Sequence, residues 1–135
     1  MLAILAHELT HHIDLFPDEF DDERHDSIWF EEGMCEYLPR KYLFTDEEFK
    51  QFVNIERKLV EVFENRYGGH SLDDFGAKSY EGSLTSIMYD YWRSFLAVKQ
   101  LVDQHNGKVR AVLDQYNEWH QSGRQMPLKE YFSIK

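Results

Sequence analysis

The sequence predicts an all-α fold of about five to six helices. Apolar residues recur every three or four positions through several long segments, which is the spacing of a helix face that packs into a core. Capping residues, glycines and prolines separate these segments, and no segment reads as a confident strand. With 135 residues, the chain has the length of one domain that can bury a core. Residues 1–135 are therefore predicted to form a single helical domain.

The first helix is expected from Leu2 to Phe16, ending before Pro17, because proline does not continue a helix interior. Its apolar residues are spaced to bury one face and are Leu2, Leu5, Leu9, Ile13 and Phe16. The acidic residues 17–26 follow as an expected surface loop.

The second helix is expected from Ile28 to Leu38. Asp26 or Ser27 can cap its start, and Pro39 is expected to interrupt or end it. A third, long helix opens with the capping box of residues 45–48 and stops at Gly68-Gly69. Its apolar stripe comprises Phe49, Phe52, Val53, Leu59, Val60, Phe63 and Tyr67.

Three more helices are expected after a loop over residues 69–78, which is rich in Gly, Ser and Asp. One runs from Tyr80 to His105, where Asn106-Gly107 ends it. An amphipathic helix follows from Lys108 to Gln121. Pro127 suits the first turn of a short last helix.

The first helix carries the pattern His-Glu-x-x-His at residues 7–11. His7 and His11 are four residues apart, so they lie about 40° from each other around the helix and both point from one face. Such a pair can bind one Zn²⁺, and Glu8 between them is placed to take a proton from a metal-bound water. The alternative is a half-buried helix that carries two histidines by chance.

A second motif follows at residues 29–36, Trp-Phe-Glu-Glu-Gly-Met-Cys-Glu. A catalytic zinc takes three protein ligands and leaves one position open, and a glutamate from this helix would complete the set. With both motifs the chain resembles the gluzincin metallopeptidases, the group of thermolysin and the zinc aminopeptidases. The resemblance implies that Glu32 is the third ligand and Glu31 a solvated neighbour. It also implies that Glu36 hydrogen-bonds a ligand histidine from behind.

The segment 91–107 is similar to the Y-x-x-S helix that follows this motif in compact bacterial gluzincins. The resemblance implies that Tyr91 donates a hydrogen bond to the oxyanion of the transition state. Tyr91 also shares a face with apolar residues, so a core tyrosine with a satisfied hydroxyl is an equal alternative. Tyr89 and Tyr80 are further candidates for the same role.

The remaining histidines and the cysteine fit a zinc site less well. A metzincin would need glycine and histidine where the chain has Asp14 and Pro17. His12 points about 100° away from His11. The other histidines are expected at the surface or at helix ends and are His25, His70, His105 and His120. Cys35, the only cysteine, excludes an internal disulfide and is expected to pack as a small buried thiol.

The net charge of −10 and the lack of a basic cluster argue against nucleic-acid binding. No apolar run is long enough for a membrane span, and Met1–Ala6 lacks the basic residues of a signal peptide. The localisation is left open, with the cytoplasm expected if the chain is complete.

The resemblance also implies a sheet-containing lobe before the first helix, which would align an extended substrate. His7 comes so early that we interpret the chain as the C-terminal part of a longer protein, with a stripped-down enzyme as the alternative. Apolar surface that such a lobe would cover is expected to favour self-association.

The predicted function is a zinc-dependent peptidase acting on a peptide or protein substrate, with ligand helices in residues 1–40 and supporting helices in residues 41–135. The first alternative is a non-catalytic zinc-binding regulatory or interaction domain, against which the retained Glu8 argues, because a structural zinc needs no base. The second is a bundle that binds iron or manganese. It would need a second Glu-x-x-His pair, which the sequence lacks.

Overall fold

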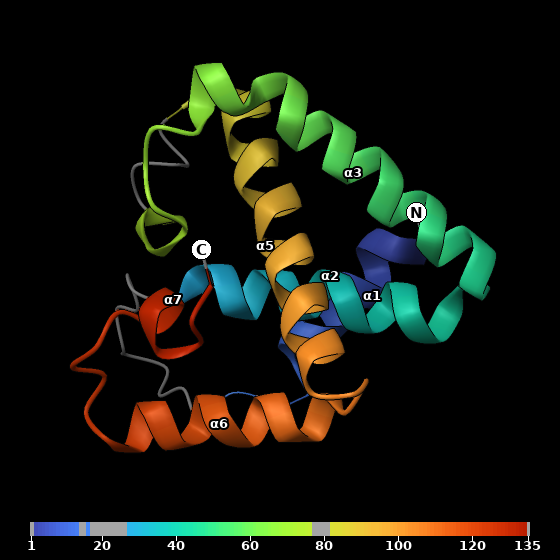
Figure 1. The fold of residues 1–135 in the computed structure, drawn as a ribbon. Helices are drawn as coiled ribbons and strands as arrows, with labels where there is room; N and C mark the ends of the chain where they lie inside the picture. The colour runs from blue at the N-terminus through green and yellow to red at the C-terminus, as the bar shows by residue number, and fades with distance from the viewer. Residues whose placement is uncertain (1, 14–15, 17–26, 77–81, 135) are drawn as a thin grey trace.

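The computed structural model describes residues 2–13, 16, 27–76 and 82–134. These residues form six α-helices and one 3-10 turn and contain no strand, so the predicted all-α fold is confirmed. The elements are α1 (Leu2–His11), α2 (Ile28–Leu43), α3 (Asp46–Tyr67), η1 (Leu72–Asp74), α5 (Leu84–Gln104), α6 (Val109–Gln121) and α7 (Leu128–Tyr131). Figure 1 shows α2 near the centre, crossed by α5, with α3 and α6 at opposite ends of α5.

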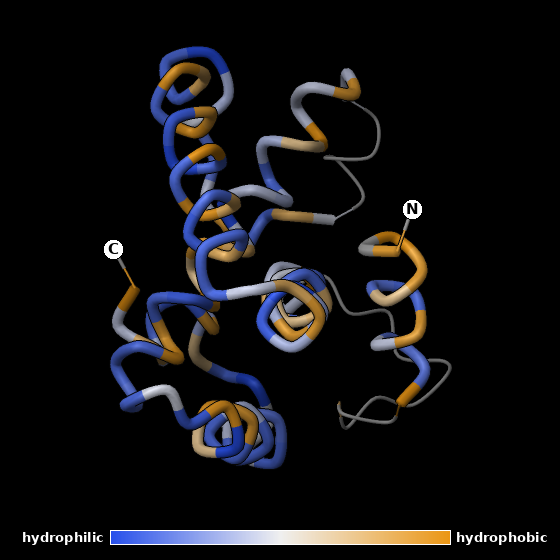
Figure 2. Tube along the Cα trace, turned by 90° about the vertical axis from the view of Figure 1, so that its right-hand side faces the viewer, coloured by the Kyte–Doolittle hydropathy of each residue, from blue (hydrophilic) through white to orange (hydrophobic). Residues whose placement is uncertain are grey.

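Helix α1 ends at His11, five residues before the predicted Phe16, and it buries a different face from the one expected. The apolar residues Leu2, Leu5, Leu9 and Ile13 are exposed, and only Phe16 of the predicted stripe is buried. Figure 2 shows α1 at the edge of the molecule with apolar residues along its length. Its packing partner is α2, and the face turned inward carries the polar residues His7 and Thr10. The histidine face therefore decides how α1 docks.

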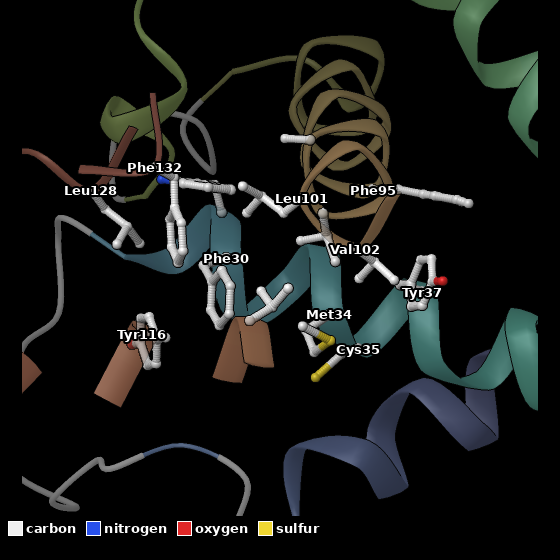
Figure 3. Close-up of a cluster of buried hydrophobic side chains, with 14 of the residues drawn as sticks. Phe30, Met34, Cys35, Tyr37, Phe95, Leu101, Val102, Tyr116, Leu128 and Phe132 are labelled. Atoms are coloured by element: carbon white, nitrogen blue, oxygen red, sulfur yellow. The ribbon is translucent and has the colours of Figure 1, made fainter. Parts of the chain in front are cut away.

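Aromatic side chains of α2 anchor the core. Trp29 and Phe30 are fully buried, and Figure 3 shows Phe30 between Tyr116 of α6 and Phe132. The Phe30 ring stacks on Tyr116 at 4.2 Å and on Phe132 at 5.7 Å between centroids. Trp29 Nε1 donates a hydrogen bond of 2.8 Å to Asp73 Oδ1 in η1. The first turns of α2 are thus fixed from several sides.

Gly33 allows α2 and α5 to approach backbone to backbone. A Cβ atom at this position would lie 2.4 Å from the carbonyl oxygen of Ser94 on α5. No side chain fits in that space, so only glycine permits this crossing. The glycine follows Glu32 in sequence. The close crossing therefore fixes how near the backbone of Glu32 lies to α5.

Helix α2 continues through Pro39 to Leu43, so the predicted end at Leu38 is wrong. A proline inside a helix removes one backbone hydrogen bond. Here the following turn is held by side chains: Arg40 pairs with Glu36 one turn earlier and with Glu56 of α3, each at 2.8 Å. Tertiary contacts outweigh the local cost of the proline.

The predicted capping box of α3 is confirmed. Thr45 Oγ1 accepts a hydrogen bond of 3.1 Å from the Glu48 backbone amide, and Glu48 Oε1 accepts one of 3.1 Å from Thr45. The loop after α3 contains η1. Helix α5 begins at Leu84 and not at Tyr80, because Ser83 caps it by accepting from Ser86 N at 3.2 Å.

The C-terminal elements follow the prediction closely. Helix α6 spans Val109–Gln121, and Pro127 stands immediately before α7 as its cap residue. Trp119 Nε1 donates to the Met126 carbonyl at 2.7 Å and closes the turn between them. The expected loop over residues 17–26, His25 and Tyr80 lie outside the described residues. No described helix has the length and apolar character needed to cross a membrane.

Candidate metal centre

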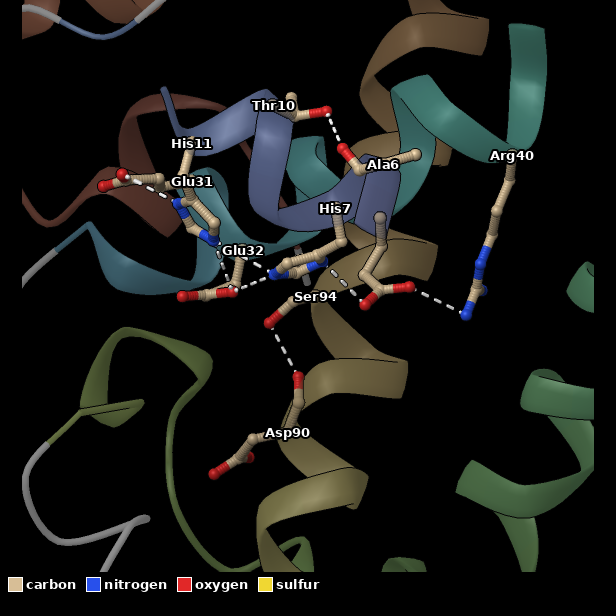
Figure 4. A network of polar contacts seen from close by, with 10 residues as sticks. Ala6, His7, Thr10, His11, Glu31, Glu32, Arg40, Asp90 and Ser94 are labelled. Carbon is tan, nitrogen blue, oxygen red and sulfur yellow. Dashed lines mark hydrogen bonds and ion pairs between the residues drawn. The ribbon is translucent and has the colours of Figure 1, made fainter. Parts of the chain in front are cut away.

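Two facing helices bring His7, His11 and Glu32 together. Both histidines project from α1 toward α2, where Glu32 points back at them (Figure 4). Glu32 Oε2 lies 3.0 Å from His7 Nε2 and 3.3 Å from His11 Nε2. The two Nε2 atoms are 3.0 Å apart. Three potential ligand atoms thus form one small triangle.

The triangle has the size of one face of a tetrahedral zinc site. Ligand bonds of about 2.0–2.1 Å at tetrahedral angles place neighbouring ligand atoms roughly 3.3 Å apart. Within the described residues, this is the one group of His, Cys, Asp and Glu side chains close enough to hold a metal ion. Glu32 Oε2 is buried and makes no well-formed hydrogen bond. The donor set and its geometry therefore fit Zn²⁺.

A second carboxylate lies behind each histidine. Glu36 Oε1 is 2.8 Å from His7 Nδ1, and Glu31 Oε1 is 3.3 Å from His11 Nδ1. Glu36 thus lies beside His7, and its role toward that ring stays a prediction. The side chain of Glu31 is 15% exposed and contacts His11, so the expectation of a solvated neighbour is wrong. Helix α1 crosses α2 so that each histidine meets its own carboxylate, an arrangement that orients ligand rings.

The carboxylates make the centre favourable for positive charge. Burial opposes protonation of His7, but Glu32 and Glu36 outweigh it and raise the pKa of His7 to about 9. Side-chain contacts with Cys35, Glu31 and Glu32 raise the pKa of His11 to about 12. Burial would raise the pKa of Glu32, yet the two histidines lower it to about 2. A cation, whether protons or a metal ion, balances this cluster.

Cys35 lies beside the centre and outside the metal-binding group. Its side chain is fully buried, and burial raises the pKa of its thiol. A thiol held in its neutral form is a poor metal ligand. The position agrees with the expected packing role.

Tyr91 lies near the centre, whereas Glu8 is exposed on α1. In sequence Glu8 stands between the two histidines. Tyr91 on α5 is half-buried, with its ring centroid 6.2 Å from that of His7 and 5.2 Å from that of Phe75. Tyr91 thus borders His7 and also packs against the core, whereas Tyr89 is buried against Tyr67.

Two residues behind the centre were missed in the sequence. Arg40 Nη2 lies 2.8 Å from Glu36 Oε2, and Arg40 Nη1 lies 2.8 Å from Glu56 Oε2. The signal was the row of Glu32, Glu36 and Arg40 at intervals of four, which shares one helix face. The predicted end of α2 before Pro39 left Arg40 outside this helix face.

The other described histidines lie away from the metal-binding group. His12 is exposed, and His105 Nδ1 lies 2.7 Å from the Leu101 carbonyl at the end of α5, as expected. His70 is not a solitary surface residue, because its Nε2 lies 2.9 Å from a carboxylate oxygen of the fully buried Asp90. Burial of Asp90 requires such a partner.

Comparison with known proteins identifies the family. The family model described as Collagenase, peptidase family M9, matches residues 2–130. No curated protein and no solved structure matches the chain. The matched range includes both helices of the metal centre and nearly all of the supporting helices. The chain therefore belongs to the collagenase family of zinc metallopeptidases.

Proposed function

We propose that the chain is a zinc-dependent peptidase of gluzincin type, in which His7, His11 and Glu32 bind Zn²⁺. The observation that carries this proposal is the triangle of ligand atoms, with sides of 3.0, 3.0 and 3.3 Å. Membership of the collagenase family supports hydrolysis of a peptide or protein substrate.

The proposal gives each side chain of the centre a role. Bound zinc supplies a Lewis acid for the scissile carbonyl and an acidified water. Glu8 is exposed and follows His7 directly in α1, and in this proposal it accepts a proton from the attacking water and passes it to the leaving amine. Tyr91 donates a hydrogen bond to the carbonyl oxygen as negative charge develops there. Glu31 and Glu36 keep the histidine rings in place.

A second candidate function is a non-catalytic zinc-binding interaction domain. The exposed apolar residues of α1 favour it, because such a surface next to a metal centre suits a protein partner. Glu8 separates the two candidates, since only a hydrolase needs a base at this position.

The experiment measures zinc content and peptide hydrolysis in matched variants. His7→Ala and Glu32→Ala should lose zinc, whereas His12→Ala, which removes an exposed histidine of the same turn, should keep it. Glu8→Gln should keep zinc and lose hydrolysis, because the amide cannot take a proton. Full zinc content in His7→Ala and Glu32→Ala would refute the metal site. Hydrolysis at the wild-type rate in Glu8→Gln would refute the proposed base, and zinc binding without any hydrolysis in the wild type would favour the interaction domain.

A further inference from the structure

A chain of charged side chains leads from His7 away from the metal centre. Glu36 makes the first step, because its Oε1 lies 2.8 Å from His7 Nδ1 and its Oε2 lies 2.8 Å from Arg40 Nη2. Arg40 makes the second step, with Nη1 2.8 Å from Glu56 Oε2 on α3. Figure 4 shows Arg40 reaching from the far part of α2 back toward His7.

Aromatic packing fixes the guanidinium of Arg40. Its Cζ lies 4.6 Å from the ring centroid of Phe52 and 4.5 Å from that of Phe95. The side chain is only 13% exposed. A guanidinium held against two aromatic faces has little freedom to turn, so the core sets where its positive charge lies relative to Glu36.

Glu56 completes the chain at a cost. Its carboxylate is buried in the middle of α3, and burial raises its pKa to about 7 despite the nearby charge of Arg40. Buried ion pairs add little to stability, because desolvation offsets their attraction. The stability of the core therefore does not explain why Arg40 and Glu56 are buried between α2, α3 and α5. The contact of Arg40 with Glu36 offers a reason.

We propose that Arg40 and Glu56 are positioning residues of the metal centre, which hold Glu36 so that it orients the His7 ring with Nε2 toward the metal. The inference rests on the zinc site of the proposed function. A carboxylate held at one oxygen can rotate, whereas Arg40 fixes the second oxygen of Glu36. With Glu36 fixed, the Nδ1 edge of the His7 ring faces a carboxylate and its Nε2 edge faces Glu32 and His11, where the metal would bind.

The test is a double-mutant cycle on zinc affinity, measured by competition with a chelator. Arg40→Gln should weaken zinc binding about tenfold, the lower range for loss of an outer partner. In the Glu36→Gln background the same change should have no further effect, because Arg40 acts through Glu36. Arg40→Lys should restore part of the affinity. In the zinc-bound protein, nitrogen NMR should show a changed Nδ1–H signal of His7 in Arg40→Gln and an unchanged one in Arg93→Gln.

Arg93→Gln is the matched control. Arg93 is also a largely buried cation, 16% exposed and 2.8 Å from Asp90, but it pairs outside this chain of residues. Its loss should lower the unfolding free energy without changing zinc affinity. If Arg40→Gln does not fold, Glu56→Gln tests the same row of charged side chains. It keeps the shape of the side chain and should weaken zinc binding severalfold.

Three outcomes would overturn the inference: wild-type zinc affinity in the folded Arg40 and Glu56 variants, an equal loss in Arg93→Gln, or an undiminished effect of Arg40→Gln in the Glu36→Gln background. Failure of the wild-type chain to bind zinc would instead overturn the proposed metal site itself, and this inference with it.

Discussion

Each histidine of the candidate metal centre lies between two carboxylates. Glu32 faces both Nε2 atoms, while Glu36 and Glu31 lie behind His7 and His11. The ring of a metal-bound histidine is normally fixed by a partner on its second nitrogen. The pattern of residues 7–11 predicted two ligands, but only the crossing of α1 over α2 reveals that adjacent glutamates serve different histidines.

Glu31→Ala should weaken zinc binding about tenfold, because His11 loses the partner of its Nδ1. Glu47→Ala is the control, because it removes an exposed carboxylate on α3 and so changes the net charge by the same amount. It should leave the zinc affinity unchanged. Zinc titration against a chelator measures both. Equal affinities for the two variants would show that the 3.3 Å contact does not orient His11.

The metal-free protein should lose stability between pH 6.5 and about 9. The pKa of His7 is raised from 6.5 to about 9 in the folded state, so its protonation stabilises the fold fully below 6.5. That contribution disappears as the pH rises through about 9. Urea unfolding with a chelator present, at several pH values, measures it. His11, whose pKa is raised from 6.5 to about 12, adds a parallel loss over the same range, so His7→Ala should make the decline below pH 9 about half as steep. An equally steep decline in His7→Ala would assign the effect to groups other than His7.

Two helices of the centre illustrate what sequence patterns can predict at the scale of an element. Periodicity and capping signals predicted the existence and order of the helices, because these depend on neighbouring residues. The end of α2 was wrong, since Arg40 and Glu56 stabilise the turn after Pro39 from a distance in sequence. The predicted buried face of α1 was also wrong. The apolar stripe of this helix does not reveal that its opposite, polar face packs against α2.

Gly33→Ala should destabilise the fold by on the order of 2–3 kcal/mol, because the new methyl group would meet the backbone of α5 at Ser94. The shift of α2 should also weaken zinc binding through the adjacent Glu32. Gly69→Ala is the matched control, since a Cβ there has no neighbour within 4 Å. Chemical denaturation compares the two, and similar stabilities would mean that α2 and α5 adjust freely.

At the scale of the whole molecule, α1 leaves an apolar surface uncovered. Leu5 and Leu9 are 57% and 56% exposed on the same helix. Replacing both with serine should reduce self-association in sedimentation measurements and leave the unfolding free energy nearly unchanged. Ile55→Ser alters an equally exposed residue, 58%, on α3, and should not change the association state. Unchanged sedimentation of the double variant would show that the α1 surface does not mediate contacts between copies.

Because α1 packs against α2 through its histidine face, metal binding would affect how readily α1 separates from the rest of the protein. Among the described elements the main contact of α1 is with α2, and the groups at that contact are the ones that would bind the metal. Zinc would therefore act as a cross-link between the N-terminal helix and the rest of the protein. Binding adds about 2.7 kcal/mol to the opening free energy at a ligand concentration of 100 times Kd. Hydrogen exchange should accordingly slow in α1 on zinc addition and stay the same in α6, which lies outside the cross-linked pair.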